Sequence, residues 1–366
     1  MIRKKIIVVN NLLGYYGAEN VLINMVNHLD QQRYDVTVLT LIESEHDRIV
    51  SGIKYKYIFR GKSSFLTKIE NKLKLTMGFE CLAKMYCNGY DIAIAFKMGE
   101  SAKLVGYCDA PKKLCWIHSN VSEIEEACSY SFKSLMEEQD FLSRFSTLVA
   151  VSKVCAESFL IKYQGDFNLK IVYNPIDVEK ILADANETLS ITEKELFNGN
   201  VPVLGTVARI DAQKRIDRLI HISERLLEEK IDHKFVIIGD GVDYKKFSDE
   251  IKQKHLDNIA FIGFQSNPYK FMKRFNLFIC SSQWESYSIV VNEALALGVP
   301  VISTKCGGPE EVLQYGKYGI LTENNEDALY FAIRKFLIEG MPKKTEYNAI
   351  ASMKNFLEKI DELFGE

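Results

Sequence analysis

Two glutamates, Glu285 and Glu293, are separated by seven residues in a segment whose neighbours predict a strand, a loop and a helix. An apolar run at 277–281 precedes them, and Gly298 and Pro300 follow where a helix would end. Glu285 would then lie in the loop, with Glu293 about two turns into the helix. Backbone N–H groups at the helix start would face a phosphate, while both carboxylates accept hydrogen bonds from hydroxyls. A nucleotide sugar carries both kinds of group.

The surroundings of Glu293 favour a binding role over a solvated one. The helix that the pattern predicts over 288–297 is otherwise largely apolar. A carboxylate in a buried helix costs free energy unless it has partners. Glu293 is therefore interpreted as a ligand-binding residue. The alternatives are a solvated helix position for Glu293, which this cost disfavours, and a solvated loop position for Glu285.

Two cations, Arg209 and Lys214, follow the predicted strand 203–208 and are five residues apart. A diphosphate leaving group gains negative charge as its bond breaks, and a protein neutralises that charge with a metal, with Arg and Lys, or with helix N-termini. The chain contains no D-x-D sequence that could hold a metal. Arg209 and Lys214 would take the metal's place, so no metal is expected. The alternative is an exposed loop with two solvated cations.

Two weaker features lie in the first half of the chain. His118 directly follows the predicted strand 114–117, and ligands of open α/β sheets bind at the carboxyl ends of strands. A single histidine is nevertheless often structural. Gly17 belongs to the glycine-containing stretch 14–19, which lacks the three-glycine dinucleotide fingerprint and could let backbone N–H groups approach a phosphate.

The composition is that of an ordinary globular protein. The 366 residues carry a net charge of −3, which argues against a dedicated nucleic-acid-binding protein. Eight cysteines without metal-ligand spacing indicate reduced thiols in a cytosolic protein. Neither a secretory signal nor a membrane-spanning stretch is recognisable, so we expect a cytoplasmic protein that is soluble or at most peripheral to a membrane.

Short β-branched runs alternate with amphipathic stretches, which predicts doubly wound parallel α/β sheets. Eleven such runs are too many for one compact sheet, and the pattern restarts near residue 200, so two domains are expected. The predicted runs are 6–10, 36–41, 92–96, 114–117, 147–151, 170–173, 203–208, 235–239, 259–262, 277–281 and 299–303. Pro175 favours a hinge after Asn174. A final amphipathic helix over 346–364 needs a partner surface.

Taken together, these segments resemble the family 4 glycosyltransferases, which are retaining enzymes with the GT-B fold. The match is nearly continuous from Val203 to about Leu337, and its motifs are residues 205–214, 237–241, 262–264, 267–269, the glutamate pair and 307–311. The first half matches more loosely, through residues 17–19, His118, 151–152 and 174–175. Tyr16 departs from the family pattern, which often has glycine there, and a bulky ring could change how an acceptor enters.

The resemblance implies a domain plan of three parts. Residues 1–174 would form an acceptor-binding Rossmann-like domain, and residues 175–345 a second one that binds the nucleotide-sugar donor. Residues 346–366 would form a helix that packs back on the first domain. The two domains would face a central cleft.

The resemblance also implies roles for single residues. Arg209 and Lys214 would grip the donor diphosphate, Glu293 would bind the nucleotide ribose, and Glu285 the hydroxyls of the transferred sugar. The other donor contacts would be the backbone N–H groups of Ser286, Tyr287 and Ser288, then Gly239 and Phe264 near the base, and Gly17 in the cleft. His118 would lie near the sugar and the incoming hydroxyl.

The acceptor is less defined than the donor. Residues 51–84 carry eight Lys or Arg against two Glu, a balance of +6, with apolar residues interleaved. Such a stretch could lie on an anionic membrane surface, or it could be a solvated helix with one face on the core. A glycan or lipid-linked acceptor of cell-surface polysaccharide synthesis is expected.

The leading hypothesis is therefore a retaining transfer of a hexose or N-acetylhexosamine from a UDP-sugar to a hydroxyl. One alternative is a non-catalytic partner subunit of glycosyltransferase-like fold. Another is a UDP-sugar 2-epimerase of related fold, which would need no acceptor.

Overall fold

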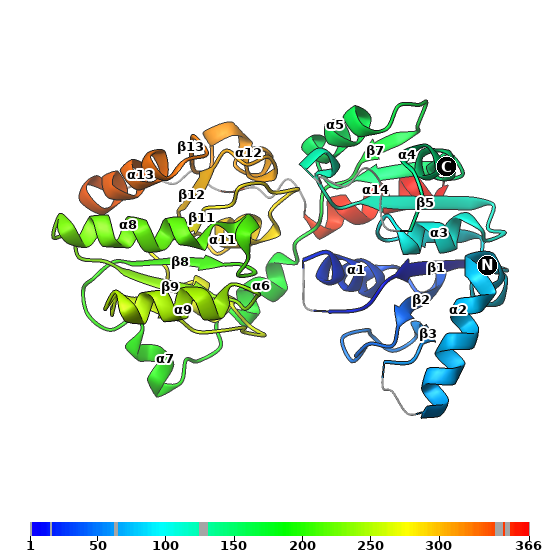
Figure 1. The fold of residues 1–366 in the computed structure, drawn as a ribbon, viewed down its shortest axis with the longest axis horizontal. Coiled ribbons are helices and arrows are strands. Elements are labelled where there is room, and N and C mark those ends of the chain that lie inside the picture. The colour runs from blue at the N-terminus through cyan, green and yellow to red at the C-terminus, as the bar shows by residue number, and fades with distance from the viewer. Residues whose placement is uncertain are drawn as a thin grey trace. The chain divides into compact units, whose positions relative to one another are not determined.

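The computed structural model describes residues 2–14, 17–61, 65–123, 131–340, 347 and 352–365. The chain divides into two compact units. Unit 1 comprises Met1–Pro175 together with Met353–Glu366, and unit 2 comprises Ile176–Ser352. Each unit is a parallel sheet with helices on both faces (Figure 1). None of the helices in the described part of the chain combines the length and hydrophobicity that a membrane span requires.

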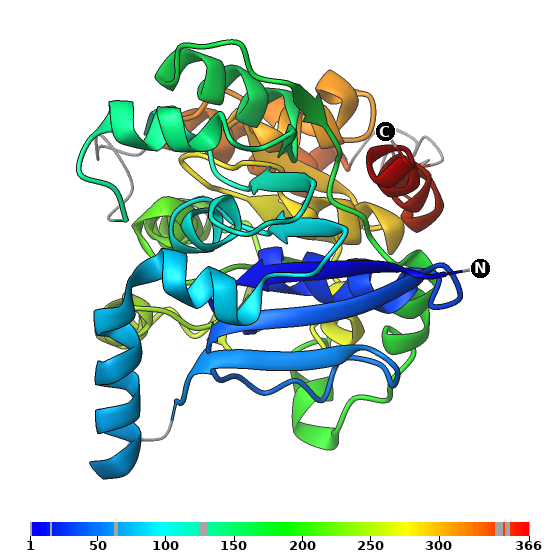
Figure 2. The same cartoon turned by 90° about the vertical axis from the view of Figure 1, so that its right-hand side faces the viewer.

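The sheet of unit 1 has seven strands in the order β3-β2-β1-β4-β5-β6-β7. Its central strands are runs of small and β-branched side chains that are buried on both faces, as parallel sheets require. The strands are β1 (Lys4–Asn10), β2 (Tyr34–Ile42), β3 (Lys54–Phe59), β4 (Ile92–Ala95), β5 (Lys112–Ile117), β6 (Thr147–Ala150) and β7 (Leu169–Ile171). Figure 2 shows the three N-terminal strands of this unit side by side.

Helices α2 to α5 contribute to one apolar core of unit 1. The helices of this unit are α1 (Gly17–His28), α2 (Phe65–Tyr86), α3 (Glu100–Gly106), α4 (Leu135–Leu142), α5 (Lys153–Lys162) and α14 (Met353–Gly365), with a 3₁₀ turn at Val121–Glu123. Helix α14 is the predicted tail helix. Its Asp361 pairs with Arg33 at 2.5 Å and accepts a bond from Tyr34 at 2.8 Å, and Phe364 packs on the Tyr34 ring. The predicted return of the tail to the first domain is therefore confirmed.

The sheet of unit 2 has six strands in the order β10-β9-β8-β11-β12-β13. The strands are β8 (Val203–Val207), β9 (Lys234–Ile238), β10 (Ile259–Phe261), β11 (Leu277–Cys280), β12 (Val301–Thr304) and β13 (Ile320–Thr322). All of the strand pairs are parallel. One face of the sheet packs against α8, α9 and α13, whose apolar stripes form a single core with it.

The helices of unit 2 are α6 (Val178–Asp184), α7 (Ile191–Glu195), α8 (Ile216–Glu228), α9 (Tyr244–Gln253), α10 (Tyr269–Met272), α11 (Ile289–Ala296), α12 (Gly308–Val312) and α13 (Glu326–Glu339), with 3₁₀ turns at Ala212–Lys214 and Gln314–Gly316. Helix α8 shows why the periodicity was informative, since Ile216, Leu219, Ile220 and Leu226 are fully buried. Leu227, which follows Leu226 in the same helix, is 39% exposed.

Two strands were absent from the prediction, β3 and β13. Strand β3 falls inside residues 51–84, which were interpreted as a single basic amphipathic stretch. That interpretation is wrong, because the stretch is an edge strand followed by helix α2. The Lys-Tyr alternation at the start of β3 fits an edge strand, because these four side chains alternate between exposed and half-buried.

In each sheet the strand order reverses direction at one place. This switch point lies between β1 and β4 in unit 1, and between β8 and β11 in unit 2. Ligands of open α/β sheets bind outside the carboxyl ends of the strands at such points. The loops that follow these four strands are therefore where functional side chains are expected.

Candidate functional site

A buried ion pair lies at the switch point of unit 2. Lys214 ends the 3₁₀ turn that follows β8, and Glu285 lies in the loop that follows β11. Lys214 Nζ donates to Glu285 Oε1 at 2.6 Å, and the two side chains are 18% and 9% exposed. Ser282 Oγ donates to the same oxygen at 2.7 Å. Burial lowers the pKa of Lys214, but the Glu285 carboxylate outweighs it and the net shift is upward. Lys214 therefore stays charged.

The two loops that carry this pair are hydrogen-bonded to each other. Gln283 N donates to the Gln213 carbonyl at 2.7 Å, and Gln213 Nε2 donates to the Trp284 carbonyl at 2.9 Å. Ser281 Oγ adds a bond to the Lys214 carbonyl at 2.8 Å. These hydrogen bonds join the loop that carries Lys214 to the loop that carries Glu285. Such supporting contacts preorganise a site.

A second set of contacts fixes Glu285 from its other side. Glu285 N donates to the Cys306 carbonyl at 2.7 Å, and Gly308 N donates to the Glu285 carbonyl at 2.9 Å. A Cβ atom at Gly308 would lie 2.3 Å from the Tyr287 backbone. The approach of these two loops therefore requires glycine at 308. This gives a physical reason for the glycine in the motif 307–311.

Arg209 is the more exposed of the two predicted cations. Its side chain is 51% exposed and Nε donates to Asp211, while Nη2 reaches Gln213 Oε1 at 3.4 Å. The two predicted cations therefore differ in exposure and in their carboxylate partners. Lys214 is buried and paired with Glu285, whereas Arg209 lies on the outside of the same loop beside a different carboxylate.

The start of helix α11 lies directly after the Glu285 loop. Ser288 is its N-cap residue, with φ of 63° and ψ of 75°. Within the described part of the chain its buried Oγ has no hydrogen-bond partner. A polar hydroxyl without a partner at a helix N-terminus is suited to a ligand oxygen. Ser286 and Tyr287 precede it, and Tyr287 is buried with its hydroxyl accepting from Asn292 at 2.9 Å.

Glu293 has the partner that a carboxylate in an apolar helix needs. Tyr269, the first residue of α10, donates its hydroxyl to Glu293 Oε1 at 2.8 Å. Burial raises the pKa of Glu293 to about 7, and the Tyr269 hydrogen bond limits that rise. Glu293 is therefore a titrating carboxyl near neutral pH, unlike an ordinary solvated glutamate.

Gly239 and Phe264 follow β9 and β10 on the same sheet. Gly239 has φ of 140°, and a Cβ atom there would lie 1.8 Å from the Ala208 carbonyl oxygen, so the close approach of two loops explains this glycine. Phe264 is 53% exposed, a position in which an aromatic ring could stack on a base. Neither residue contacts the Lys214–Glu285 pair through a hydrogen bond in the described structure.

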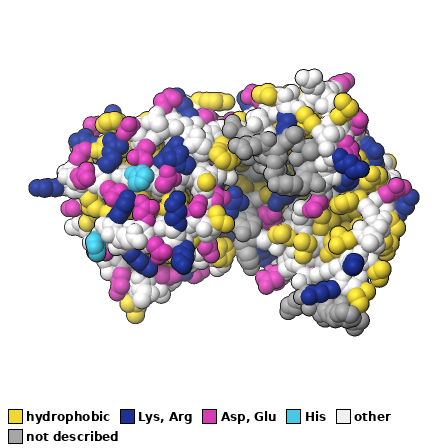
Figure 3. All heavy atoms as spheres, in the orientation of Figure 1, with side chains coloured by type: hydrophobic (Ala, Val, Ile, Leu, Met, Phe, Trp, Pro, Cys, Tyr) yellow, Lys and Arg dark blue, Asp and Glu magenta, His cyan; other side chains and the backbone are white. Residues whose placement is uncertain are grey.

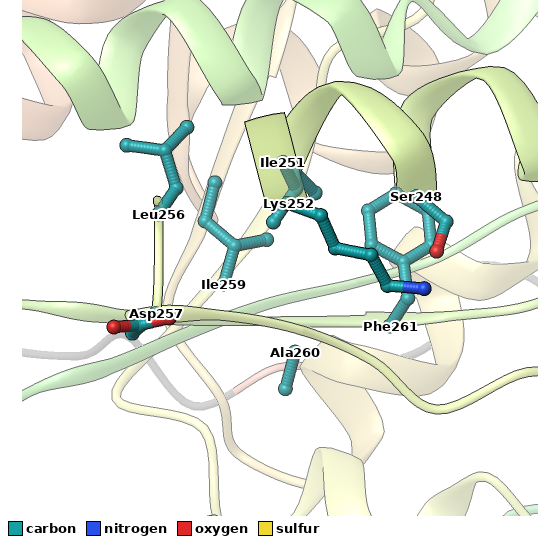
Figure 4. A pocket seen from close by; sticks show the side chains of 8 residues that line it. All are labelled: Ser248, Ile251, Lys252, Leu256, Asp257, Ile259, Ala260 and Phe261. Atoms are coloured by element: carbon teal, nitrogen blue, oxygen red, sulfur yellow. The ribbon is translucent and has the colours of Figure 1, made fainter. Parts of the chain in front are cut away.

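Two hollows in unit 2 differ in what lines them. The first has a volume of ≈ 10 Å³ and is bordered by Lys214, Ser282 and Glu285. This volume is too small for a sugar, so a donor would lie over the Lys214–Glu285 pair. The other, of ≈ 350 Å³, lies between α9 and the edge strand β10 (Figure 4). Its walls are mainly the apolar side chains of Ile251, Leu256 and Ile259, and it contains none of the predicted site residues.

In unit 1, His118 follows β5 at the carboxyl edge of the sheet. Its ring packs beside Phe96, with 4.8 Å between ring centroids. Burial, together with the nearby Lys97 ammonium, lowers the pKa of His118 to about 3. Gly17 begins helix α1. Tyr16, the predicted departure from the family pattern, lies outside the described residues.

Several residues that contact the predicted site residues were not predicted from the sequence. Tyr269 and Ser282 contact the two glutamates, and Lys97 lies near His118. Buried Arg218 supports the Glu285 loop, since it donates to the Ser281 carbonyl and to Gln283 Oε1, both at 3.0 Å. Position after a strand end was the available signal for Ser282 and Lys97. Within the residues that the structure describes, no cluster of metal-ligating side chains was found.

Comparison with known proteins places these features in a family context. Residues 188–352 match the family model described as glycosyl transferases group 1. An uncharacterized glycosyltransferase of Methanocaldococcus jannaschii is 32% identical over 231 residues, which cover 58% of this chain and 56% of the relative. The N-acetyl-alpha-D-glucosaminyl L-malate synthase of Bacillus anthracis is 26% identical over 267 residues, which cover 64% of this chain and 66% of that protein.

A Campylobacter jejuni transferase that adds N-acetylgalactosamine to a diphospho-undecaprenol-linked sugar is 29% identical over 194 residues, or 52% of this chain and 50% of the relative. The chain thus spans less than two thirds of the length of these three relatives. The predicted resemblance to family 4 glycosyltransferases is confirmed by the family model and the relatives.

Solved structures show the fold. Anabaena HepE, in complex with UDP and glucose, superimposes with a TM-score of 0.76 at 18% identity, over 100% of both chains. WaaG, a glycosyltransferase of lipopolysaccharide biosynthesis, gives a TM-score of 0.68 at 14% identity over 91% of this chain and 90% of that one. The fold is GT-B, with two Rossmann-like units, as predicted.

Proposed function

We propose that this chain is a retaining glycosyltransferase that moves a hexose or N-acetylhexosamine from a UDP-sugar to a hydroxyl of a glycan or lipid-linked acceptor. The observation that carries the proposal is the buried Lys214–Glu285 pair at the switch point of unit 2. A structural neighbour supports UDP as the nucleotide, because HepE was solved in complex with UDP-glucose.

The ion pair suits a donor that has both an anionic and a hydroxylated part. Lys214 and Glu285 neutralise each other at 2.6 Å. A donor diphosphate would take over the ammonium, and sugar hydroxyls would donate to the released carboxylate. The exchange leaves neither buried charge without a partner, which avoids the cost of an isolated buried ion. Arg209, at the outer side of the loop, would add a second cation to the diphosphate.

The start of α11 and Glu293 would hold the rest of the donor. The backbone N–H groups and the Ser288 hydroxyl at the helix start would bind phosphate or sugar oxygens. Glu293 would accept hydrogen bonds from the ribose, in a position set by Tyr269. Phe264, with its exposed ring, would contact the base, and the Gly239 turn would let the base approach the backbone.

Charge development at the leaving group explains why cations are needed. As the bond from the anomeric carbon to the phosphate oxygen breaks, the UDP gains negative charge that Lys214, Arg209 and the α11 N-terminus stabilise. The acceptor oxygen forms its bond on the same face of the sugar, and its proton passes to the departing phosphate oxygen. Metal independence is part of the proposal, and transfer in the presence of excess EDTA tests it.

Contact with a membrane surface is a further part of the proposal. Helix α2 exposes Leu73 and Leu75 at 62% and 68%, and Ile69 at 44%, beside the exposed Lys68 and Lys72. Hydrophobic side chains are gathered on the part of unit 1 that includes this helix (Figure 3). Apolar side chains flanked by lysines suit an anionic lipid surface. An acceptor linked to a lipid would be presented there.

Incubation with a panel of UDP-sugars, with UDP release as the readout, tests the proposal. We expect release from one or a few donors, and the NMR anomeric coupling of the product to show retained configuration. A chain that neither releases nor binds UDP would overturn the enzyme assignment and favour a non-catalytic partner subunit. Release of free epimerised sugar without an acceptor would instead identify a 2-epimerase.

A further inference from the structure

A second buried lysine–glutamate pair lies at the switch point of unit 1. Glu19 is in the first turn of α1, which follows β1, and Lys97 follows β4. Lys97 Nζ donates to Glu19 Oε1 at 2.5 Å. The Glu19 side chain is 3% exposed, whereas that of Lys97 is 35% exposed. The carboxylate is thus covered and the ammonium is open to a ligand.

His118 lies beside this pair at the end of β5, the strand next to β4. Burial lowers the pKa of His118, and Lys97 is close enough for its charge to contribute to the decrease. The imidazole is therefore neutral at physiological pH. A hydrogen bond to the Phe96 backbone opposes these effects, so the ring nitrogen at that carbonyl carries the proton. The other nitrogen then has a free lone pair.

The unused polar atoms of this cluster are hydrogen-bond acceptors. Among the residues that the structure describes, neither Glu19 Oε2 nor His118 Nε2 has a hydrogen-bond partner, and both atoms are buried. Buried acceptors without a donor cost free energy, so a ligand that supplies donors is expected there. Hydroxyl groups are such donors, whereas a phosphate or carboxylate brings only acceptors. Lys97 can donate to an oxygen of the same ligand.

The charge of the cluster points in the same direction. Glu19 and Lys97 cancel each other, and His118 is neutral. An anionic ligand would meet the free oxygen of the Glu19 carboxylate and be repelled by it. A neutral ring with neighbouring hydroxyls would satisfy Glu19 Oε2 and His118 Nε2 together.

We propose that Glu19, Lys97 and His118 form a subsite for a neutral, polyhydroxylated ligand, which is the sugar end of the acceptor. The inference rests on the proposed function, because that function supplies the need for a sugar acceptor. It narrows the acceptor to one that presents a glycan ring at this subsite, with any phosphate or lipid lying elsewhere. The carboxylate acceptor named for the Bacillus anthracis relative is the contrasting case.

The test measures ligand binding to the full chain by saturation-transfer NMR. The neutral probes are the methyl glycosides of glucose, galactose, N-acetylglucosamine and N-acetylgalactosamine, and the anionic probes are L-malate and glycerol 3-phosphate. We expect at least one methyl glycoside to bind with millimolar affinity and the anionic probes to bind at least tenfold more weakly. The inference would be overturned if an anionic probe bound more tightly than the glycosides, or if none of the glycosides bound.

Substitution then assigns the binding to this cluster. Lys97→Met and Glu19→Gln should each weaken glycoside binding about tenfold, and UDP affinity should stay within twofold. The double variant E19Q/K97M removes both charges, so that it leaves no lone buried ion and guards against misfolding of a single variant. Lys84→Met is the matched control, because Lys84 pairs with Glu80 at 2.8 Å on the exposed side of α2. Unchanged glycoside binding in the folded double variant would contradict the inference.

The two proposals fail in different ways. Absence of UDP release and UDP binding in the wild-type chain would refute the glycosyltransferase itself. Intact UDP release, with acceptor KM values that do not respond to Glu19 or Lys97, would refute only the subsite. A rise in acceptor KM with an unchanged donor KM is expected, and loss of folding would instead change both.

Discussion

The switch points of the two units carry the same pair of side chains in different settings. In unit 2, Lys214 and Glu285 are both largely buried, with Ser282 on the carboxylate and a helix N-terminus in the next segment. In unit 1, Glu19 is buried, Lys97 is partly exposed and a neutral histidine lies beside them. The first setting offers donors and a cation for a phosphate, whereas the second offers acceptors for hydroxyls.

The difference shows that an ion pair at a switch point does not by itself define a ligand. The surrounding polar groups decide which part of the pair is available. Next to Glu285 are N–H and O–H donors that suit an anion, while the free atoms next to Lys97 are Glu19 Oε2 and His118 Nε2. The two units have the same kind of parallel sheet, but the site in unit 2 would bind a nucleotide-sugar donor and the site in unit 1 a neutral sugar acceptor.

The largest expected effect is on transfer after a change of Glu285. Glu285→Ala leaves Lys214 buried without its carboxylate and removes the contact with the sugar hydroxyls. We expect kcat to fall by about a hundredfold to a thousandfold, the range seen when one transition-state contact is lost. UDP affinity should fall much less. UDP release and UDP titration measure the two effects.

The matched control for this change is Glu323→Ala. Glu323 also pairs with a lysine, Lys305, at 2.5 Å in unit 2, but its side chain is 69% exposed. Transfer by this variant should stay within twofold of wild type, because exposed ion pairs contribute little. Equal losses in both variants would show that the burial of the Glu285 pair has no special role.

A second prediction concerns the free energy of unfolding after Glu293→Gln. The folded protein holds the Glu293 proton with a pKa of about 7, against an ordinary value of 4.5. A carboxyl whose pKa is raised by folding destabilises the folded state as pH rises from the lower value to the higher one, and the full cost is present above pH 7. Glu293→Gln should therefore stabilise the protein by on the order of 2–3 kcal/mol at pH 8.

The gain should be smaller at pH 5.5 than at pH 8, and chemical denaturation at the two pH values measures it. Glu339→Gln, at an exposed position near the end of α13, is the control and should change stability little at either pH. A gain from Glu293→Gln that does not grow with pH would show that Glu293 is not held in an unfavourable buried state.

A smaller effect is expected from Tyr269→Phe. The Tyr269 hydroxyl lowers the pKa of Glu293 by donating to it, and Asp177 and Asp184 are the other charged groups near Tyr269. Loss of the hydroxyl should raise the Glu293 pKa, so the pH at which UDP-glucose binding strengthens should move upward. Calorimetric titration between pH 5.5 and 8.5 measures this midpoint. Tyr244→Phe on α9 should leave it in place.

The sequence predicted the sheets well where strands are buried on both faces. All eleven predicted runs overlap strands, because strands of a parallel sheet that are buried on both faces form short, nearly continuous apolar runs. The missed strands are the edges β3 and β13. Strand β3 begins with alternating Lys and Tyr, and β13 has only two apolar residues before Thr322, so neither forms a continuous apolar run of four residues.

The sequence predicted several residues of the site but not which of them form ion pairs or hydrogen bonds with one another. Lys214 and Glu285 are 71 residues apart, and no local pattern shows that one would neutralise the other. Tyr269 lies 24 residues before Glu293, and an isolated tyrosine in a short helix has no distinctive spacing. Glu19 and Lys97, 78 residues apart, meet only because β1 and β4 are neighbours in the sheet.

The most direct test of this account is a calorimetric titration of UDP into the wild-type chain, Glu293→Ala and the double variant E19Q/K97M. We expect the wild-type chain to bind UDP and Glu293→Ala to bind at least about tenfold more weakly, a loss of about 1.4 kcal/mol. The unit 1 double variant should bind as the wild type does. No binding by the wild-type chain, or an equal loss in both variants, would contradict the assignment of the nucleotide to unit 2.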